Sequence, residues 1–425
     1  MKNERQKRQT NNQVHSELQL RICMLEPHPY RPDMFIDPTL TTSIHLANLG
    51  HQVTWILSSY EDRQVRSFFF KDVHVYLIPR VQFLPGSSVY VGIANKILDT
   101  LRRLRLIPKI IERENCNIVF TRGEEPSDGL IAAYVKRKYK IPLVFRLVDP
   151  LEQEWETWKL LNVKPRFVHY LIAKFNVLVK SYVMKKAALV IPSVSGYKEA
   201  LVKKGIAASK VISSAGVGVD ITLFSNQNGR NVREKYALSD SKLVIYVGTL
   251  DKPRCLNVLI QAFSKVKEER HSKLLIVGEG SDEENLKRLV YELGMREDVV
   301  FTGRVPQPDV PCMIAAADIG ISPVPPFSFY QASSPIKVHE YMAMGKPVVA
   351  NQEIPDHKAV LEQSGGGILV SFTAEAFANA IIELIDDPER AAEMGRRGRE
   401  WISNNRTYEI ISRELETQYQ KLLGV

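Results

Sequence analysis

The fold can be argued outward from the stretch Ser333-Ser334-Pro335-Ile336-Lys337-Val338-His339-Glu340-Tyr341-Met342-Ala343-Met344-Gly345-Lys346-Pro347-Val348-Val349-Ala350. Ser334 suits an N-cap, Pro335 suits the first helical position, and Gly345 followed by Pro347 ends a helix, so we expect a helix over about 335–344 and then a buried strand. Lys337 falls in the first turn, where the helix dipole disfavours a cation unless an anion lies opposite. A bound phosphate, held by free backbone N–H groups, is one such anion.

The expected helix has two distinct faces. Val338, Tyr341 and Met342 share a face that can pack, whereas Lys337 and Glu340 lie together on a neighbouring face. The alternative to a phosphate site is a surface Lys337–Glu340 ion pair, worth about 0.3 kcal/mol. The stretch alone leaves both interpretations open.

Strands and helices alternate on both sides of this stretch. In the second half we expect strands at Leu243–Val247, Lys273–Val277, Asp298–Phe301, Asp318–Ser322, Pro347–Ala350 and Ile368–Val370. In the first half we expect strands at Ile22–Leu25, Val53–Leu57, Val73–Ile78, Asn117–Phe120, Pro142–Leu147, Ala188–Ile191 and Lys210–Ser213, and helices at about 38–50, 92–113, 126–139, 155–186 and 195–204. This alternation predicts an α/β protein with two Rossmann-like, doubly wound domains of parallel strands, which bind ligands in a central cleft.

The length of 425 residues favours two or three domains. We expect a disordered basic tail over 1–18, an N-terminal domain over 19–215 and a C-terminal domain over 216–400, with a flexible linker near 214–225. Asp387 and Pro388 start a helical segment that runs to the terminus, and a surface helix is its simplest account. An alternative for the last part, 401–425, is that it crosses back to the N-terminal domain.

Composition excludes several classes of protein. Hydrophobic residues make up 44% and charged residues 25%, as in ordinary globular proteins, and no run of about 18 apolar residues predicts a transmembrane helix. The four cysteines are far apart in sequence, so neither a zinc site nor a disulfide framework is indicated, and a reducing cytoplasm fits best. The net charge of +9 favours anionic partners, among them nucleotides and acidic lipids, but no nucleic-acid-binding module is recognisable.

Two glycine-containing loops follow strands in the second half. Gly248 ends one strand, and Lys252 and Arg254 precede the helix Asn257–Lys267, an arrangement that suits phosphate, although such loops are often basic by chance. The loop Val277-Gly278-Glu279-Gly280 lacks the third glycine of a dinucleotide-binding fingerprint and more simply opens the helix Glu283–Leu293.

The order of these pieces resembles the donor half of family 4 glycosyltransferases, which have the GT-B fold. The resemblance rests on Tyr246-Val247-Gly248-Thr249-Leu250, Leu275-Ile276-Val277-Gly278-Glu279-Gly280, Val300-Phe301-Thr302-Gly303-Arg304-Val305, Ala316-Ala317-Asp318 and Glu340 through Val349, and on Gly218-Val219-Asp220 with Phe224. It covers about 188–422, including a closing segment from Asp387 through Tyr419. Over 20–187 it is looser and rests on the strand–helix order, Ile118-Val119 and Pro142-Leu143-Val144.

The resemblance implies a retaining transfer of a sugar from a nucleotide diphosphate sugar, such as a UDP- or GDP-sugar, with no metal and no cofactor. Glu340 would accept hydrogen bonds from the ribose, the backbone at Arg304 and Val305 would hold the base, and Arg254 and Lys337 would stabilise the leaving diphosphate. The implied donor-binding set is Gly248, Thr249, Arg254, Gly278, Arg304, Val305, Ser333, Ser334, Pro335, Ile336, Lys337 and Glu340.

The chain departs from the family pattern at several positions. A glutamate is frequent eight residues before Glu340, where Ala332 stands, and Thr249 replaces an arginine. Arg254 and Cys255 occupy the place of a Lys-Gly pair, so Arg254 is assigned the phosphate role. In the first half, Val148-Asp149 replaces His-Asp, and Glu26 through Asp33 replaces a glycine-rich loop.

Acid–base candidates follow strands of the first half. Asp149 is the catalytic candidate, and the acceptor-side candidates are His28, Tyr30, Arg31, Asp33 and Glu125. Each of them could instead be a turn or capping residue. A retaining enzyme of this kind can use the phosphate of its substrate as base, so no catalytic base is assigned.

A cationic, aromatic-rich segment raises the question of membrane binding. No acidic residue lies between Glu156 and Glu199, and a second basic stretch covers 102–109. The helical spacing of Val163, Phe167, Leu171, Phe175 and Tyr182 predicts that part of this segment faces the core. The alternatives are a packed helix with a solvated basic face, or a helix that lies on anionic lipid through 157–198 and 102–109.

The leading hypothesis is a cytoplasmic glycosyltransferase, peripheral at the inner face of the membrane, with a lipid-linked, glycan or polysaccharide acceptor. A nucleotide-sugar epimerase or phosphorylase of the same fold is an alternative. A degenerate transferase that acts as a binding scaffold is another, because Ala332, Thr249 and Val148 depart from the family pattern. The base, the sugar, the acceptor and the linkage stay open.

Overall fold

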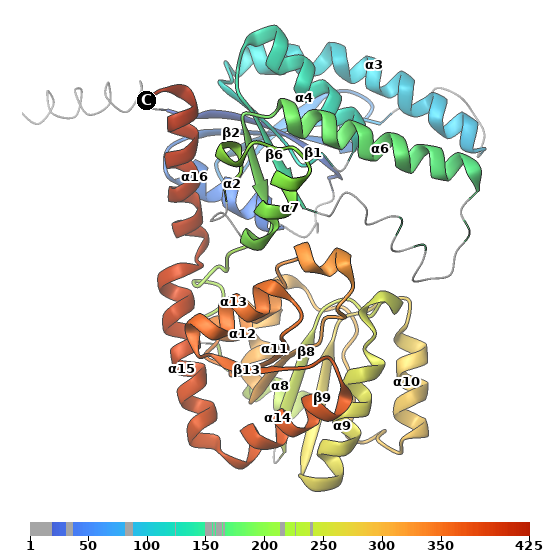
Figure 1. Ribbon diagram of the computed structural model, residues 1–425, viewed down its shortest axis with the longest axis vertical. Coiled ribbons are helices and arrows are strands. Elements are labelled where there is room, and N and C mark those ends of the chain that lie inside the picture. The colour runs from blue at the N-terminus through green and yellow to red at the C-terminus, as the bar shows by residue number, and fades with distance from the viewer. Residues whose placement is uncertain are drawn as a thin grey trace, which may run out of the picture. The chain divides into compact units, whose positions relative to one another are not determined.

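The computed structural model describes residues 19–30, 37–80, 88–123, 125–148, 155, 158, 164, 166–212, 217–225, 227–238 and 241–425. The chain divides into two compact units. Unit 1 comprises the described residues of Met1–Leu151, Pro165–Ala215 and Ile411–Val425, and unit 2 those of Glu152–Lys164 and Gly216–Ile410. In Figure 1 the colour runs along the chain, so that the red C-terminal helix α16 can be followed from unit 2 into unit 1.

Unit 1 is built on a seven-stranded sheet in the order β3-β4-β2-β1-β5-β6-β7. The strands are β1 Arg21–Pro29, β2 Gln52–Ser59, β3 Arg66–Phe70, β4 Val73–Pro79, β5 Ile118–Thr121, β6 Leu143–Leu147 and β7 Leu189–Pro192. All pairs are parallel except β3 with β4. Leaving out the edge strand β3, the strands have the Rossmann order 3-2-1-4-5-6.

Helices cover both faces of this sheet. They are α2 Pro38–Asn48, α3 Val89–Arg113, α4 Pro126–Tyr139, α6 Phe167–Lys186, α7 Lys198–Lys203 and α16 Tyr408–Leu423, with short 3₁₀ turns at Ser195–Tyr197 and Ala208–Lys210. One core contains Ile107 of α3, Ile131 of α4 and Val183 of α6, whereas the other contains Leu40 of α2 and Leu415 of α16. Helices α3, α4 and α6 therefore lie on one face, and α2 and α16 on the other.

Unit 2 is built on a six-stranded parallel sheet in the order β10-β9-β8-β11-β12-β13. The strands are β8 Lys242–Val247, β9 Ser272–Val277, β10 Val299–Phe301, β11 Ile319–Ser322, β12 Val348–Asn351 and β13 Gly367–Val370. The helices are α8 Arg230–Lys235, α9 Asn257–Glu269, α10 Glu283–Glu292, α11 Val310–Ala316, α12 Ile336–Ala343, α13 Pro355–Ser364, α14 Ala374–Asp386 and α15 Pro388–Asn405. This is again the 3-2-1-4-5-6 order, and its strand order reverses between β8 and β11, where ligands bind in such sheets.

The prediction of an α/β fold with two Rossmann-like sheets is confirmed, but several elements differ. The edge strand β3 was not predicted, and the expected strand Lys210–Ser213 is reduced to a single bridge between Val190 and Val211. Helix α6 begins at Phe167, and the larger part of 155–166 lies outside the described residues.

The C-terminal segment is two helices, both with a buried face. Asp387 caps α15 by accepting a hydrogen bond from the backbone N–H of Arg390 at 2.9 Å, as predicted. The helical path breaks at Arg406, whose carbonyl oxygen accepts from the N–H of Val219 at 2.9 Å. Ile402 and Tyr419 are almost fully buried, so the expectation of a simple surface helix was wrong. Among the described helices, none is both long and apolar enough to cross a bilayer.

Candidate functional site

The candidate site lies in unit 2, at the carboxyl end of β8 and beside α12. Tyr341 of α12 fixes the helix against the sheet, because its hydroxyl accepts a hydrogen bond from the backbone N–H of Val247 at 2.8 Å. The ring of Tyr341 packs so close to Gly320 of β11 that a Cβ there would lie 2.4 Å from it. The N-terminal turn of α12 is therefore held at the switch point of the sheet.

Two glycines bring the loops after β8 and β9 into contact. Gly248 and Gly278 have φ values of +149° and +139°, which side chains other than hydrogen rarely allow. A Cβ on Gly278 would lie 1.9 Å from the carbonyl oxygen of Gly248. The backbone N–H of Gly278 donates to the carbonyl oxygen of Gly303 at 3.0 Å, and this bond places Arg304 and Val305 next to the same loops.

Helix α12 begins without a side-chain cap. Its N-cap is Pro335, and the predicted cap, Ser334, instead donates from Oγ to Oδ2 of Asp356 at 2.6 Å. The prediction of a Ser334 cap was wrong, because Asp356 of α13 is a stronger, charged acceptor. Ser333 also turns away from the helix and donates to the carbonyl oxygen of Tyr330 at 2.7 Å. The N–H of Val338 donates to the carbonyl oxygen of Pro335 at 3.1 Å, which leaves the uncapped N–H groups of Ile336 and Lys337 available to an anion.

Lys337 is buried beside Gly248. Its ammonium nitrogen lies 3.9 Å from the centroid of the Tyr246 ring, and a Cβ on Gly248 would lie 2.9 Å from this nitrogen. Burial, and then the charge of the nearby Arg254, hold the pKa of Lys337 well below its usual range. A bound anion would reverse this effect, since it favours the charged form.

Arg254 supplies the second cation. It ends the 3₁₀ turn Lys252–Arg254, and its guanidinium carbon lies 5.1 Å from the centroid of the Tyr330 ring. Its Nε donates to the Thr249 hydroxyl at 3.3 Å. Thr249, which replaces an arginine of the family pattern, therefore helps to orient Arg254.

Glu340 lies one turn further along α12. Burial raises its pKa to about 7, although the charge of Lys337 acts in the opposite direction. Lys337 and Glu340 are only 9% and 7% exposed, so the alternative of a surface ion pair was wrong. With Arg254 included, the site holds two cations and one carboxyl group, an excess of positive charge that suits a diphosphate.

The structure therefore brings together most of the predicted donor-binding residues, around the start of α12. Three further residues were missed by sequence analysis: Tyr246 and Tyr330, whose rings support the cations, and Asp356, which holds Ser334. The available signal for Asp356 was an acidic residue directly after Pro355, in the first turn of α13. The aromatic side chains gave no comparable signal, because tyrosines in or near strands are common in cores.

Two buried histidines belong to helices α12 and α13. The pKa of His339 and that of His357 are each lowered to about 4 by burial. His357 lies 3.0 Å from both the Ser322 hydroxyl and the carbonyl oxygen of Asn351, so it joins α13 to β11 and β12. Both rings are neutral at physiological pH and support the packing of α12 and α13.

The acceptor-side candidates belong to unit 1. Asp149, Arg31 and Asp33 lie outside the described residues. His28 is exposed on β1, Tyr30 follows β1 and lies 5.4 Å from Phe68 between ring centroids, and Glu125 is the N-cap residue of α4.

Sequence analysis missed a buried charged cluster at the same edge of this sheet. Arg122 forms an ion pair with Asp37, and its Nη1 lies 3.6 Å from the carboxylate of Glu26, which is fully buried. Arg122 follows β5, Glu26 lies within β1, and Asp37 is the N-cap residue of α2. The carboxyl edge of the sheet in unit 1 is therefore charged.

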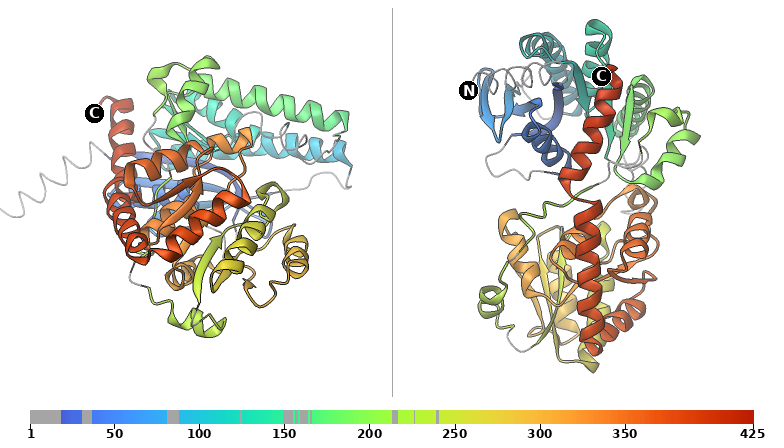
Figure 2. Two further views of the ribbon diagram at one scale, coloured as in Figure 1. Left: turned by 60° about the horizontal axis from the view of Figure 1, so that its bottom comes forward. Right: turned by 90° about the vertical axis from the view of Figure 1, so that its left-hand side faces the viewer.

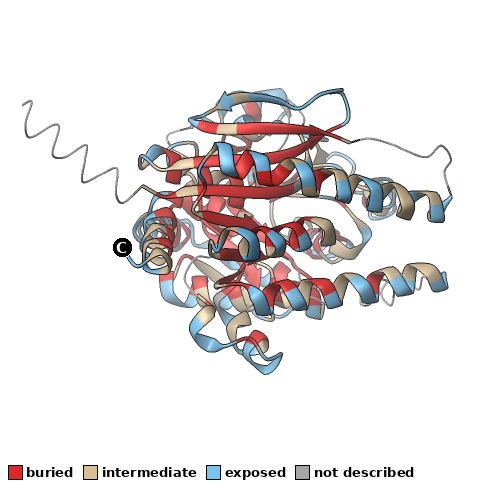
Figure 3. Ribbon diagram, turned by 90° about the horizontal axis from the view of Figure 1, so that it is seen from above, coloured by how far each residue is buried: buried red, intermediate tan, exposed pale blue. Residues whose placement is uncertain are grey.

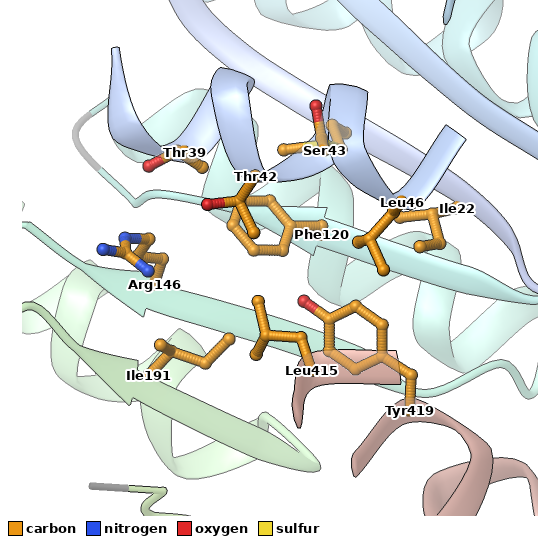
Figure 4. A pocket seen from close by; sticks show the side chains of 11 residues that line it. Ile22, Thr39, Thr42, Ser43, Leu46, Phe120, Arg146, Ile191, Leu415 and Tyr419 are labelled. Atoms are coloured by element: carbon orange, nitrogen blue, oxygen red, sulfur yellow. The ribbon is translucent and has the colours of Figure 1, made fainter. Parts of the chain in front are cut away.

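A small cavity occurs nearby in unit 1, between the sheet, α2 and α16. Its volume is about 20 Å³, and Arg146, Thr42 and Tyr419 are among the residues around it in Figure 4. This volume accommodates about one water molecule and no sugar. Within the described part of the chain, no group of three or more His, Cys, Asp or Glu side chains could hold a metal ion.

Residues 229–401 match the family described as glycosyl transferases group 1. The chain is 30% identical over 221 residues to the GDP-mannose-dependent alpha-(1-6)-phosphatidylinositol monomannoside mannosyltransferase of Mycolicibacterium smegmatis, a match of 51% of this chain and 58% of that protein. It is 27% identical over 209 residues to the N-acetyl-alpha-D-glucosaminyl L-malate synthase of Bacillus anthracis, covering 48% of this chain and 52% of that one. The chain thus spans about half the length of the curated relatives it matches.

Solved structures resemble nearly the whole chain. Sucrose-phosphate synthase from Thermosynechococcus elongatus has a TM-score of 0.73 at 17% identity, covering 96% of this chain and 100% of that one. HepE of Anabaena, solved in complex with UDP and glucose, has a TM-score of 0.70 at 17% identity, with 95% and 100% covered. At such identities the likeness establishes the fold alone, which is GT-B.

Proposed function

We propose that the chain, whose residues 229–401 form a glycosyl transferases group 1 domain, is a retaining glycosyltransferase of the family 4 type. The donor is a nucleotide diphosphate sugar, and the acceptor is lipid-linked, a glycan or a polysaccharide. The observation that carries the proposal is the buried Lys337 beside Arg254 at the uncapped start of α12. Relatives named as GDP-mannose-dependent and a neighbour solved with UDP support a nucleotide-sugar donor.

Each part of the site has a chemical role in this proposal. Sugar transfer breaks the bond between the anomeric carbon and the diphosphate, so negative charge develops on the phosphate oxygens. Lys337, Arg254 and the N-terminus of α12 stabilise this charge without a metal ion, because they are positioned before the reaction starts. Glu340, when ionised, accepts hydrogen bonds from the ribose hydroxyls, and the close approach of Gly248 and Gly278 gives the diphosphate access to the backbone.

The proposal is tested by thermal shifts with UDP, GDP, ADP and their sugars. A ligand that binds only the folded protein raises its melting temperature by mass action. We expect one base to be preferred, and we expect Arg254→Ala and Glu340→Ala each to reduce the shift strongly. Lys242→Gln is the matched control, because Lys242 is exposed at the opposite end of β8. Equal shifts for the parent and both site variants would contradict the assignment of the donor site.

Products then separate the remaining alternatives. A transferase releases the nucleoside diphosphate and forms a new glycosidic bond, whereas an epimerase returns a nucleotide sugar with changed stereochemistry. A scaffold binds the nucleotide sugar and releases neither product. Incubation of the preferred nucleotide sugar with membrane or glycan extracts, followed by mass spectrometry and NMR of the products, distinguishes the three outcomes.

A further inference from the structure

Helix α6 of unit 1 presents a row of large apolar side chains to solvent. Sequence analysis predicted that part of this helix faces the core, which is the case, but the core-facing part is not this row. Phe167, Leu171, Phe175, Leu178 and Tyr182 are 75%, 48%, 54%, 67% and 51% exposed. At about 100° per residue they fall within an arc of about 80°, and they are called the α6 stripe below. The core side of the helix is formed instead by Ala173, Val179, Val183 and Met184.

The charges on α6 all have one sign. The helix of 20 residues has no acidic side chain, and it carries Lys174, Lys180, Lys185 and Lys186. The amino group of Lys174 lies 5.0 Å from the centroid of Tyr170, and that of Lys186 lies 5.8 Å from the centroid of Tyr182 in the stripe. Lys174, Lys185 and Lys186 are exposed and lie in or beside the apolar row, whereas Lys180 lies on the other side of the helix. Three cations beside the row are the opposite of a solvated polar face on a packed helix.

Helix α3 adds a second exposed row. Tyr90, Ile97 and Leu101 are 75%, 56% and 53% exposed, and their positions fall within an arc of about 40°. Exposed cations, Lys96, Arg105 and Lys109, lie on the same helix. Helices α3 and α6 lie on the same face of the sheet, and each of them contacts α4. Figures 1 and 2 show α3 and α6 roughly parallel, and Figure 3 shows that burial is confined to parts of each helix. The two rows thus belong to one side of unit 1.

We propose that α3 and α6 form a lipid-docking face that holds unit 1 on an anionic membrane surface. A contiguous row of exposed apolar side chains on a protein surface marks an interaction site. Apolar side chains can insert among the acyl chains of a membrane, while lysines beside them bind the anionic headgroups. A second copy of the same face would bring lysines against lysines, so charge disfavours self-association. Tyr182 suits the headgroup boundary, because its apolar ring and its polar hydroxyl are both satisfied there, whereas Phe175 supplies only apolar surface.

Flotation of the full chain with vesicles tests this inference without any sugar or nucleotide. We expect binding to vesicles of phosphatidylcholine mixed with phosphatidylglycerol, weak binding to phosphatidylcholine alone, and loss of binding as salt rises. Phe175→Ser with Leu178→Ser removes apolar insertion, and we expect a loss of affinity of about tenfold or more. Lys174→Gln with Lys185→Gln removes two charges, and we expect a similar loss at low salt.

Matched controls lie on unit 2. Tyr291 is 60% exposed on α10, so Tyr291→Ser controls for the loss of an exposed aromatic side chain, and Lys242→Gln with Lys265→Gln controls for charge. Circular dichroism and melting temperature establish that each variant is folded.

Binding that is absent, indifferent to anionic lipid, or unchanged in both α6 variants would overturn the proposal. A dimer in ultracentrifugation that Phe175→Ser with Leu178→Ser dissociates, without lipid binding, would identify a second copy as the occupant. Nucleotide binding by unit 2 is measured separately, so failure here leaves the proposed function standing.

Discussion

Lys337 and Glu340 lie one helical turn apart on α12, and both side chains are held out of water before any ligand arrives. Burial shifts the pKa of each group toward its neutral form, down for Lys337 and up for Glu340. The charged form of each group is therefore less stable in the folded chain than in water. A site that keeps such groups gives up folding stability in exchange for strong interaction with a charged ligand.

The first prediction concerns Glu340 and pH. Its pKa of about 7 in the folded state exceeds the ordinary value of 4.5, so the stability it contributes is complete below pH 4.5 and is lost as the pH rises through 7. We expect Glu340→Gln to gain stability relative to the parent over this range, by at most ~3 kcal/mol. Urea unfolding of both proteins at pH 5 and pH 8 measures the difference.

The control for this experiment is Glu292→Gln, which removes an exposed carboxylate from α10. Its effect should be the same at both pH values. If Glu340→Gln behaves in the same way as Glu292→Gln, Glu340 is not buried as described.

The second prediction concerns Asp356, which holds Ser334 directly before α12. This residue is 3% exposed, accepts from Ser334, and lies 3.7 Å from His339 and 3.9 Å from Arg406. We expect Asp356→Ala to cost about 3 kcal/mol in unfolding free energy, because it leaves buried polar partners unsatisfied. We expect Ser334→Ala to cost about 1 kcal/mol. Denaturant unfolding measures both, and equal costs would show that Asp356 acts through Ser334 alone.

These residues also mark what sequence could predict about the site. Gly248, Arg254 and Lys337 were indicated by local signals, namely the ends of strands and the starts of helices. The role of Glu340 was implied only by the family resemblance. The partner of Ser334 could not be predicted from local signals, because Asp356 lies 22 positions further along the chain and only folding brings it close. The burial of Lys337 and Glu340 could not be predicted either, since it depends on packing against Tyr246 and the sheet.

Elements were predicted better than their orientation. Alternating strands and helices were recognised because buried parallel strands give short apolar runs, and nearly all of the expected strands occur. Periodicity on α6 correctly identified an apolar row but not its direction, because a helix pattern does not state which face meets the core. The edge strand β3 was missed because its only strand partner is β4, so its alternation is weak and half-exposed.

The third prediction tests the contact between the loops after β8 and β9. Gly278→Ala places a Cβ 1.9 Å from the carbonyl oxygen of Gly248 at a φ of +139°, so we expect a loss of at least ~3 kcal/mol in unfolding free energy. Gly294 also has a positive φ, +69°, but a Cβ there meets nothing within 4 Å, so Gly294→Ala should cost about 1 kcal/mol. Chemical unfolding compares the two, and similar losses would mean that backbone conformation, not the close contact, is responsible.

At the scale of the molecule, the chain leaves unit 1 after Ala215 and returns to it at Ile411. Helix α16 then completes the core of unit 1, where Ile411, Leu415 and Tyr419 are at most 3% exposed. Glu416 of the same helix lies 2.9 Å from His51, and the hydroxyl of Ser412 donates to the carbonyl oxygen of Thr42 at 3.1 Å.

The fourth prediction follows from this helix. Deletion of 408–425 uncovers apolar surface on the sheet and α2, and we expect unit 1 to lose ~5 kcal/mol or more, comparable to the stability of a whole domain. Limited proteolysis with mass spectrometry should then find cleavage in unit 1 before unit 2. Deletion of Gly424 and Val425 alone is the control and should leave the cleavage pattern unchanged. Intact unit 1 in the longer deletion would contradict the role of α16.

The position of α16 also determines the order in which a newly made chain can finish folding. The N-terminal part of unit 1 is translated before unit 2, yet the hydrophobic core of unit 1 stays incomplete until α16 has been made. The sheet and helices of unit 2 all lie between Gly216 and Ile410, so unit 2 can complete its core before α16 is made. A chain released early by a premature stop would therefore carry an unfinished N-terminal unit, which exposes it to proteases and removes incomplete copies from the cell.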